Sequence, residues 1–280
     1  MQQRIDTKAR TARYAFNSLR ELGQWIDATP RTWRTLQSKR NAPEKSWDLN
    51  LGYAGALKLA SDGWIEGAQR AQKALREFQP AQPAPAMVTD FYGHMPHVPR
   101  FCAGAPDSMI RHANPPRFGE GKVLTLYVPL SASCATNAVY MANYGLGVAQ
   151  YVNQLESEGT RCEVWGCLTQ LDGWRVTFAF KVKSAEQPLD LAVMAFAIGH
   201  PAIFRRIGFA LLERCASPTM DGYGYPQNAD KGDLIDPPHS AVILNGMKAA
   251  NTTAKTPEQA LEAITAEIEK AIELQWEQGT

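Results

Sequence analysis

Residues 123–133 read VLTLYVPLSAS, and this stretch decides the fold class. Val123 to Val128 is a short apolar run rich in β-branched and aromatic residues, which is typical of a strand buried on both faces. A helix is expected from about Asn137 to Glu156, followed by a second strand at 161–168. Because a helix between two strands allows them to pair in parallel, the sequence predicts a strand-helix-strand unit.

The chain beyond this unit continues to alternate between strands and helices. Asp172-Gly173 is a hairpin signal that joins 161–168 to a strand at 174–182, which we expect to be an antiparallel edge. The remaining expected elements are helices at 189–198 and 201–215, a short central strand at 241–244, and a last helix opened by Thr256, Pro257 and Gln259 as N-cap, N1 and capping box. We therefore expect residues 118–280 to form an α/β domain with a Rossmann-like, mostly parallel sheet and helices on both faces.

The N-terminal part has a different composition. Apolar residues at helical spacing predict an amphipathic helix over 8–28, and a second helical stretch over 51–78 is interrupted near Asp62-Gly63. Residues 1–78 are therefore expected to be a small basic helical module. The Pro-rich run 79–86 begins a linker and connector that extends over 79–117.

Charge and composition limit the function classes. The 280 residues carry a formal net charge of +1, but residues 1–45 hold ten Lys or Arg against four Asp or Glu, which favours a polyanionic ligand near the N-terminus. No apolar run of about 18 residues and no secretory signal is present, so we expect a cytoplasmic protein without membrane contact. The five cysteines form no Cys-x-x-Cys pair and are expected to be reduced.

The segment after the first strand carries a family resemblance. Pro129-x-Ser131-x-Ser133 is similar to the Asp-x-Ser-x-Ser metal motif of von Willebrand factor A domains, with proline in place of the aspartate. Together with the order of elements over 118–280, it resembles a degenerate domain of that family. The resemblance implies a platform at the strand ends that binds a protein, such as an AAA-type ATPase. Proline supplies no ligand oxygen, so neither a metal nor another cofactor is expected.

Basic and aromatic residues alternate near the N-terminus, which is typical of single-stranded nucleic-acid binders, because cations contact phosphates and aromatic rings stack on bases. A solvated basic face over a small helical core is the alternative. The predicted nucleic-acid-binding residues are Arg10, Arg13, Tyr14, Arg20, Arg31, Trp33, Arg34, Lys39, Arg40 and Lys45.

Two further stretches, 57–67 and 98–106, resemble proteins encoded by tailed bacteriophages. Phages that carry a two-subunit RNA polymerase also encode a single-stranded-DNA-binding transcription and replication factor. This resemblance implies DNA as the ligand and the phage RNA polymerase, or another phage protein, as a partner. Self-association into a homo-oligomer is a further expectation.

Two loops are secondary candidates for a ligand or partner. The first holds Ser131, Ser133 and Cys134, whose alternative readings are a hydrolytic nucleophile and plain capping of the following helix. The second is the long glycine-containing loop with Tyr223 and Tyr225. With no residue predicted to be catalytic, the sequence favours a non-enzymatic single-stranded-DNA-binding protein of a phage. The alternative is a protein-interaction adaptor.

Overall fold

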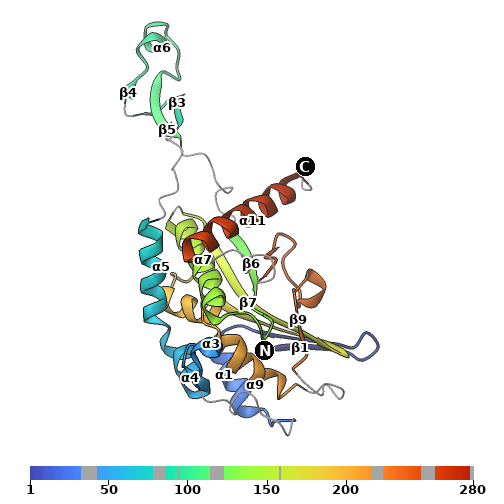
Figure 1. The fold of residues 1–280 in the computed structure, drawn as a ribbon. Coiled ribbons are helices and arrows are strands. Elements are labelled where there is room, and N and C mark those ends of the chain that lie inside the picture. The colour runs from blue at the N-terminus through green and yellow to red at the C-terminus, as the bar shows by residue number, and fades with distance from the viewer. Residues whose placement is uncertain are drawn as a thin grey trace. The chain divides into compact units, whose positions relative to one another are not determined.

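The computed structural model describes residues 1–32, 43–77, 86–93, 95–113, 123–157, 159–215, 223–246 and 256–277 (Figure 1). The chain divides into two compact units. The main unit consists of residues 1–75 together with 123–280, and the small unit of residues 76–122.

One sheet forms the centre of the main unit. Its strands are β1 (Gln2–Asp6), β2 (Thr11–Phe16), β6 (Val123–Pro129), β7 (Arg161–Asp172), β8 (Trp174–Lys183), β9 (Tyr225–Gln227) and β10 (Val242–Ile243). The order is β1-β2-β8-β7-β6-β10, and β9 pairs with β7. Pairings β6·β7, β6·β10 and β2·β8 are parallel, whereas β1·β2, β7·β8 and β7·β9 are antiparallel.

The predicted strand-helix-strand unit is confirmed. β6 and β7 pair in parallel, and helix α7 (Ala138–Ser157) connects them in the sequence. Gly173, at a φ of 66°, turns the chain between β7 and β8 as the Asp-Gly signal predicts. The fold is therefore α/β and compatible with a Rossmann-like arrangement. Strand β8 is not an edge, however, because β2 pairs along its other side.

The helices of the main unit largely follow the predicted stretches. They are α1 (Leu19–Ala28), α3 (Lys45–Asp48), α4 (Gly52–Asp62), α5 (Ile65–Glu77), α8 (Leu191–Met194), the π-helices η1 (Ala195–Gly199) and η2 (Ile203–Gly208), α9 (Phe209–Leu212), the 3-10 helix η3 (Lys231–Asp233) and α11 (Pro257–Glu277). The predicted break near Asp62-Gly63 separates α4 from α5, and the Thr256 hydroxyl accepts a hydrogen bond from the Gln259 N–H as an N-cap should.

The two faces of the sheet are covered differently. On one face, Phe178 packs near Trp25 of α1, and Leu168 lies beside Gly208 of η2. On the other face, Tyr127, Cys167 and Ala179 form a core with Ala229, Leu234 and Ala241. The last three belong to the segment 228–243, whose described helical part is the short η3. We call this segment the cover segment.

The N-terminal residues do not form a separate helical module, which corrects the predicted domain at 1–78. The stretch expected as one helix over 8–28 is strand β2 followed by α1, and β2 belongs to the main sheet. Ala12, Tyr14 and Phe16 are buried at every second position, the period of a strand. The predicted boundary near residue 78 does lie close to the start of the small unit.

The small unit holds secondary structure in place of the expected plain connector. Strands β3 (Ala86–Asp90), β4 (Met95–Pro96) and β5 (Met109–Ala113) form a three-stranded sheet in the order β3-β5-β4, and helix α6 (Val98–Cys102) connects β4 to β5. Both pairings are antiparallel.

No single described helix is long and apolar enough to cross a membrane. The bent pair Leu191–Gly199 and Ile203–Leu212, at an angle of 62°, meets the length and composition criteria when taken together. Most of its residues are buried in the main unit, and none is exposed.

Helix α7 approaches η1 so closely that only glycine fits at one position. A Cβ atom at Gly145 would overlap the carbonyl oxygen of Ile198 and the Cα of Gly199. Gly23 of α1 is a matched contrast, because a Cβ there meets no atom within 4 Å.

We predict that Gly145→Ala lowers the free energy of unfolding by about 1–3 kcal/mol or more, because α7 and η1 must separate. Gly23→Ala should raise it by about 0.5–1 kcal/mol, because alanine is the better helix former. Urea unfolding followed by circular dichroism measures both changes. Equal midpoints for Gly145→Ala and the unmodified protein would contradict this packing.

Candidate functional site

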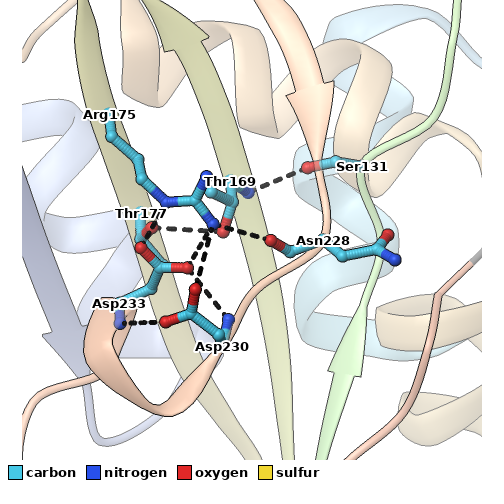
Figure 2. Close-up of polar contacts among 7 residues, drawn as sticks. All are labelled: Ser131, Thr169, Arg175, Thr177, Asn228, Asp230 and Asp233. Carbon is cyan, nitrogen blue, oxygen red and sulfur yellow. Dashed lines mark hydrogen bonds and ion pairs between the residues drawn. The ribbon is translucent and has the colours of Figure 1, made fainter.

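Polar side chains gather beyond the carboxyl end of β6 and along β7 and β8 (Figure 2). The Ser131 hydroxyl accepts a hydrogen bond of 2.8 Å from the Thr169 N–H. The Thr169 and Thr177 hydroxyls lie 3.1 Å apart on neighbouring strands. These contacts fix the segment after β6 against β7, and they occupy Ser131 in a structural role.

Arg175 of β8 joins this region to the cover segment. Its Nη2 donates to Oδ2 of Asp233 at 2.5 Å and to the carbonyl of Asn228 at 2.8 Å, while its Nε donates to the other oxygen of Asp233. Asp230 lies 3.7 Å from the same Nη2. The hydrogen bond to Asp233 raises the pKa of Arg175, although burial opposes this. We call this arrangement the Arg175 clamp.

The charged groups of the clamp interact with one another and with the backbone of the cover segment. Asp230 and Asp233 also cap η3 reciprocally, since each side chain accepts from the backbone N–H of the other. No group of three or more His, Cys, Asp or Glu in the described residues is placed to hold a metal ion. A guanidinium neither attacks a substrate nor exchanges protons at ordinary pH, and the Nε and Nη2 groups of Arg175 are occupied by the cover segment. The clamp therefore positions a segment of the chain.

Two consecutive buried arginines of η2, Arg205 and Arg206, lie close to the loop that follows β6. Arg206 donates to Oδ2 of Asp48 through Nε at 2.7 Å, and both residues are fully buried. Burial favours the neutral acid, but hydrogen bonds from the Glu44 N–H, Arg206 and the Gly52 N–H together lower the pKa of Asp48.

Arg205 is held mainly by carbonyl groups. It donates to the carbonyls of Trp47, Ser133 and Thr136, and its guanidinium carbon lies 4.2 Å from the centre of the Trp47 ring. Burial lowers the pKa of Arg205 to about 10. The loop 133–136 is thus attached to α3 and η2 through one side chain.

The serine loop itself has the geometry of helix capping. Asn137 Oδ1 accepts from the Val139 N–H at 2.8 Å, and Ser133 Oγ accepts from the Ala135 N–H at 3.3 Å. Ser133 and Cys134 are exposed. His200 is buried elsewhere, against Trp64, and burial lowers its pKa to about 4. These contacts support the capping interpretation of the loop over the hydrolytic one.

The described members of the predicted nucleic-acid-binding set differ in how far they are exposed. Tyr14 is 2 % exposed and stacks on Phe178 at 4.8 Å, so it cannot receive a base, which corrects that prediction. Arg13 is partly buried and lies opposite Arg4 in the β1·β2 register. The exposed members of the set are Arg10, Arg20, Arg31 and Lys45. Trp33, Arg34, Lys39 and Arg40 lie outside the described residues.

The two loop tyrosines differ. Tyr223 stacks on Phe209 at 4.2 Å and donates a hydrogen bond to Glu213, so packing accounts for it. Tyr225 of β9 is 74 % exposed and is available for contact.

An open groove of about 890 Å³ lies beside the N-terminal end of α1. Its lining includes three cationic residues, Arg20, Lys181 and Lys183, and the carboxylate of Asp27. The two lysines already bind Glu163 and Glu156, at 2.8 Å each. Arg20 is therefore the cation of this lining that remains exposed to a ligand.

The small unit presents an exposed apolar surface that sequence reasoning missed. Six large apolar side chains there are at least 45 % exposed: Met87, Phe91, Tyr92, Met95, Val98 and Phe101. We call them the apolar patch. A usable signal was present, since residues 86–101 are rich in large apolar residues within a stretch expected to be a solvated connector.

The main unit is thus an α/β fold in which the Arg175 clamp attaches the cover segment to the sheet. The sequence from residue 3 to residue 274 matches the family described as Domain of unknown function (DUF7192), and the chain belongs to that family. No curated protein and no solved structure matches the chain.

We predict that Asp233→Asn releases the cover segment, because Arg175 then loses a charged bidentate partner. The free energy of unfolding should fall by about 1–3 kcal/mol. Amide hydrogen exchange at 228–236 should become faster, as mass spectrometry of the peptides can measure. Asp236→Asn is the matched control, because Asp236 and its partner Arg4 are exposed and such pairs contribute within about 1 kcal/mol. Equal exchange rates in the two variants would show that the clamp does not hold the segment.

Proposed function

We propose that this protein is a non-enzymatic interaction protein, an adaptor that docks a protein partner on the apolar patch of the small unit. The observation that carries the proposal is the exposure of the patch, which reaches 82 % at Tyr92. Exposed apolar residues that gather in one place mark interaction sites, whereas single ones are ordinary. Phe and Tyr are also among the residues enriched at protein interfaces.

The main unit supports this proposal by what its polar residues do. The strand ends, where a von Willebrand factor A domain would carry its metal, hold the Arg175 clamp, whose charged groups pair with one another. A protein-binding role needs neither a metal nor a nucleophile there. A phage RNA polymerase and an AAA-type ATPase remain predicted partners, and the host-cell cytoplasm remains the predicted location.

Photo-cross-linking tests the adaptor proposal. A photoreactive phenylalanine analogue in place of Tyr92 should form an adduct with a polypeptide in the cells that make the protein. The same analogue in place of Tyr225 is the control, because that tyrosine is 74 % exposed but lies outside the patch.

The double variant Phe91→Asp/Phe101→Asp should weaken binding of the partner polypeptide to the apolar patch by at least about 30-fold. Loss of one aromatic anchor costs about 2 kcal/mol, which corresponds to that factor in the dissociation constant. Adducts of equal yield at positions 92 and 225, or no polypeptide adduct at position 92, would refute the proposal.

Single-stranded DNA binding is a second candidate, and the groove beside α1 is the observation that favours it. Exposed Arg20 lies in the lining together with the polar side chains of Asn17, Ser18 and Gln24. This arrangement suits a phosphate backbone more than a stacked base, because the lining contains no aromatic residue.

We predict that a labelled mixed-sequence oligonucleotide binds with salt-dependent affinity if this candidate is right. Three phosphate contacts correspond to a loss of about 20-fold between 50 and 200 mM salt. Arg10→Ala/Arg20→Ala/Arg31→Ala, which removes Arg20 of the groove and two exposed arginines of the predicted set that lie outside its lining, should abolish most of that salt dependence in fluorescence anisotropy.

The matched control for this measurement is Arg4→Ala/Arg100→Ala/Arg161→Ala, which removes the same charge from arginines that pair with Asp236, Asp107 and Glu156. Equal loss in the two triple variants would indicate attraction by net charge without a site. Absence of binding at low salt would exclude this candidate.

A further inference from the structure

The small unit has almost no interior of its own. Among its residues with described burial, Ser108 is buried, and none of its large apolar side chains is. Cys102 is a free, exposed thiol, so no disulfide of that residue stabilises the unit. A segment of this size without a core, disulfide or metal ordinarily needs another surface for stability.

The strand register places part of the apolar patch on one face of the small sheet. Thr89 of β3 and Met95 of β4 both lie opposite Ile110 of β5, and Met87 is two residues before Thr89 on the same strand. Residues two apart on a strand share a face, so Met87, Ile110 and Met95 lie on the same face of the small sheet. Phe91 and Tyr92 follow β3 directly, and Val98 and Phe101 lie on α6.

The size of the patch matches what a dimer needs. Six side chains at these exposures offer on the order of 700 Å² per chain, given that a buried aromatic side chain removes 150–250 Å² from water. Two copies would bury roughly 1,400 Å², which is within the range of specific interfaces.

The charges of the small unit also permit self-pairing. Residues 86–113 hold Arg100 and Arg111 against Asp90 and Asp107, and Arg100 and Asp107 already pair at 2.5 Å. Two copies would therefore meet without net repulsion. In the described sheet, β3 and β4 are the two outer strands, and an outer strand can accept another strand by backbone hydrogen bonds.

We propose that the apolar patch pairs with the same patch on a second copy of this chain, so that the small units form a homodimer interface. This proposal rests on the docking role given to the patch above, and it names the partner. The partner is always present at matching concentration, and each patch supplies the core that the other lacks.

Sedimentation velocity of the full chain from low to high micromolar concentration tests the pairing. We expect a monomer-dimer equilibrium that favours the dimer as concentration rises. Phe91→Asp/Phe101→Asp should raise the dissociation constant by at least about 30-fold. Ile65→Asp/Val139→Asp is the matched control, because these two apolar residues are also exposed but belong to the main unit. A control variant that dissociates equally would overturn the proposal.

Thiol labelling provides a second measurement that does not depend on a patch variant folding. Cys102 and Cys134 are the exposed cysteines of the chain, so Cys134→Ser leaves Cys102 as the reactive thiol. Labelling of Cys102 should slow as the protein is concentrated, because α6 becomes covered.

The outcomes separate the two proposals. A monomer at every concentration, with fast labelling of Cys102 and a cross-link from position 92 to another polypeptide, overturns self-pairing and leaves the adaptor function standing. A monomer that floats with lipid vesicles and forms no polypeptide adduct overturns both.

Discussion

The buried ion pair between Arg206 and Asp48 is the constraint on which the main unit depends. Both side chains are fully excluded from water, and charges in that position cost several kcal/mol each unless they are paired and hydrogen-bonded. Asp48 also accepts the N–H groups of Glu44 and Gly52, which shapes the chain as it enters α4. Because Arg205 beside it holds the loop after β6, one dipeptide of a π-helix fixes both the N-terminal helices and the strand-end loop. Removing either partner would leave an uncompensated charge inside the core.

The elements predicted correctly are those whose signals are local. The apolar run at 123–128, the hairpin at Asp172-Gly173 and the capping residues before α11 each specify structure through neighbours within a few residues. The strand-helix-strand centre of the fold could therefore be predicted from sequence. The position of β8 within the sheet could not, because it depends on β2, which pairs with it from the far end of the chain.

The N-terminal misassignment and the candidate site share one cause. Ala12, Ala15, Phe16 and Leu19 fit helical spacing, while Ala12, Tyr14 and Phe16 fit a strand, and only the buried partner Phe178 decides between the two. That contact makes Tyr14 part of the core and removes it from any ligand surface. The Arg175 clamp likewise joins β8 to a segment more than fifty residues later. The sequence identified Ser131 and Tyr225 as candidate residues. It did not show that Arg175 would contact Asp230 and Asp233.

The main unit consists of two segments of the chain, 1–75 and 123–280, and this arrangement affects the order in which its sheet can form during synthesis. During synthesis β2 leaves the ribosome long before β8, yet Phe16 pairs with Phe180. Until β8 emerges, the apolar sides of β2 and α1 have no sheet to pack against. The small unit, which lies between α1 and β8 in the sequence, has by then already emerged. Contacts so distant in sequence form slowly and leave aggregation-prone surface open to solvent. Pairing of β2 with β8 is therefore a late step in the formation of this sheet, and until it occurs the N-terminal segment carries an apolar strand without its sheet neighbour.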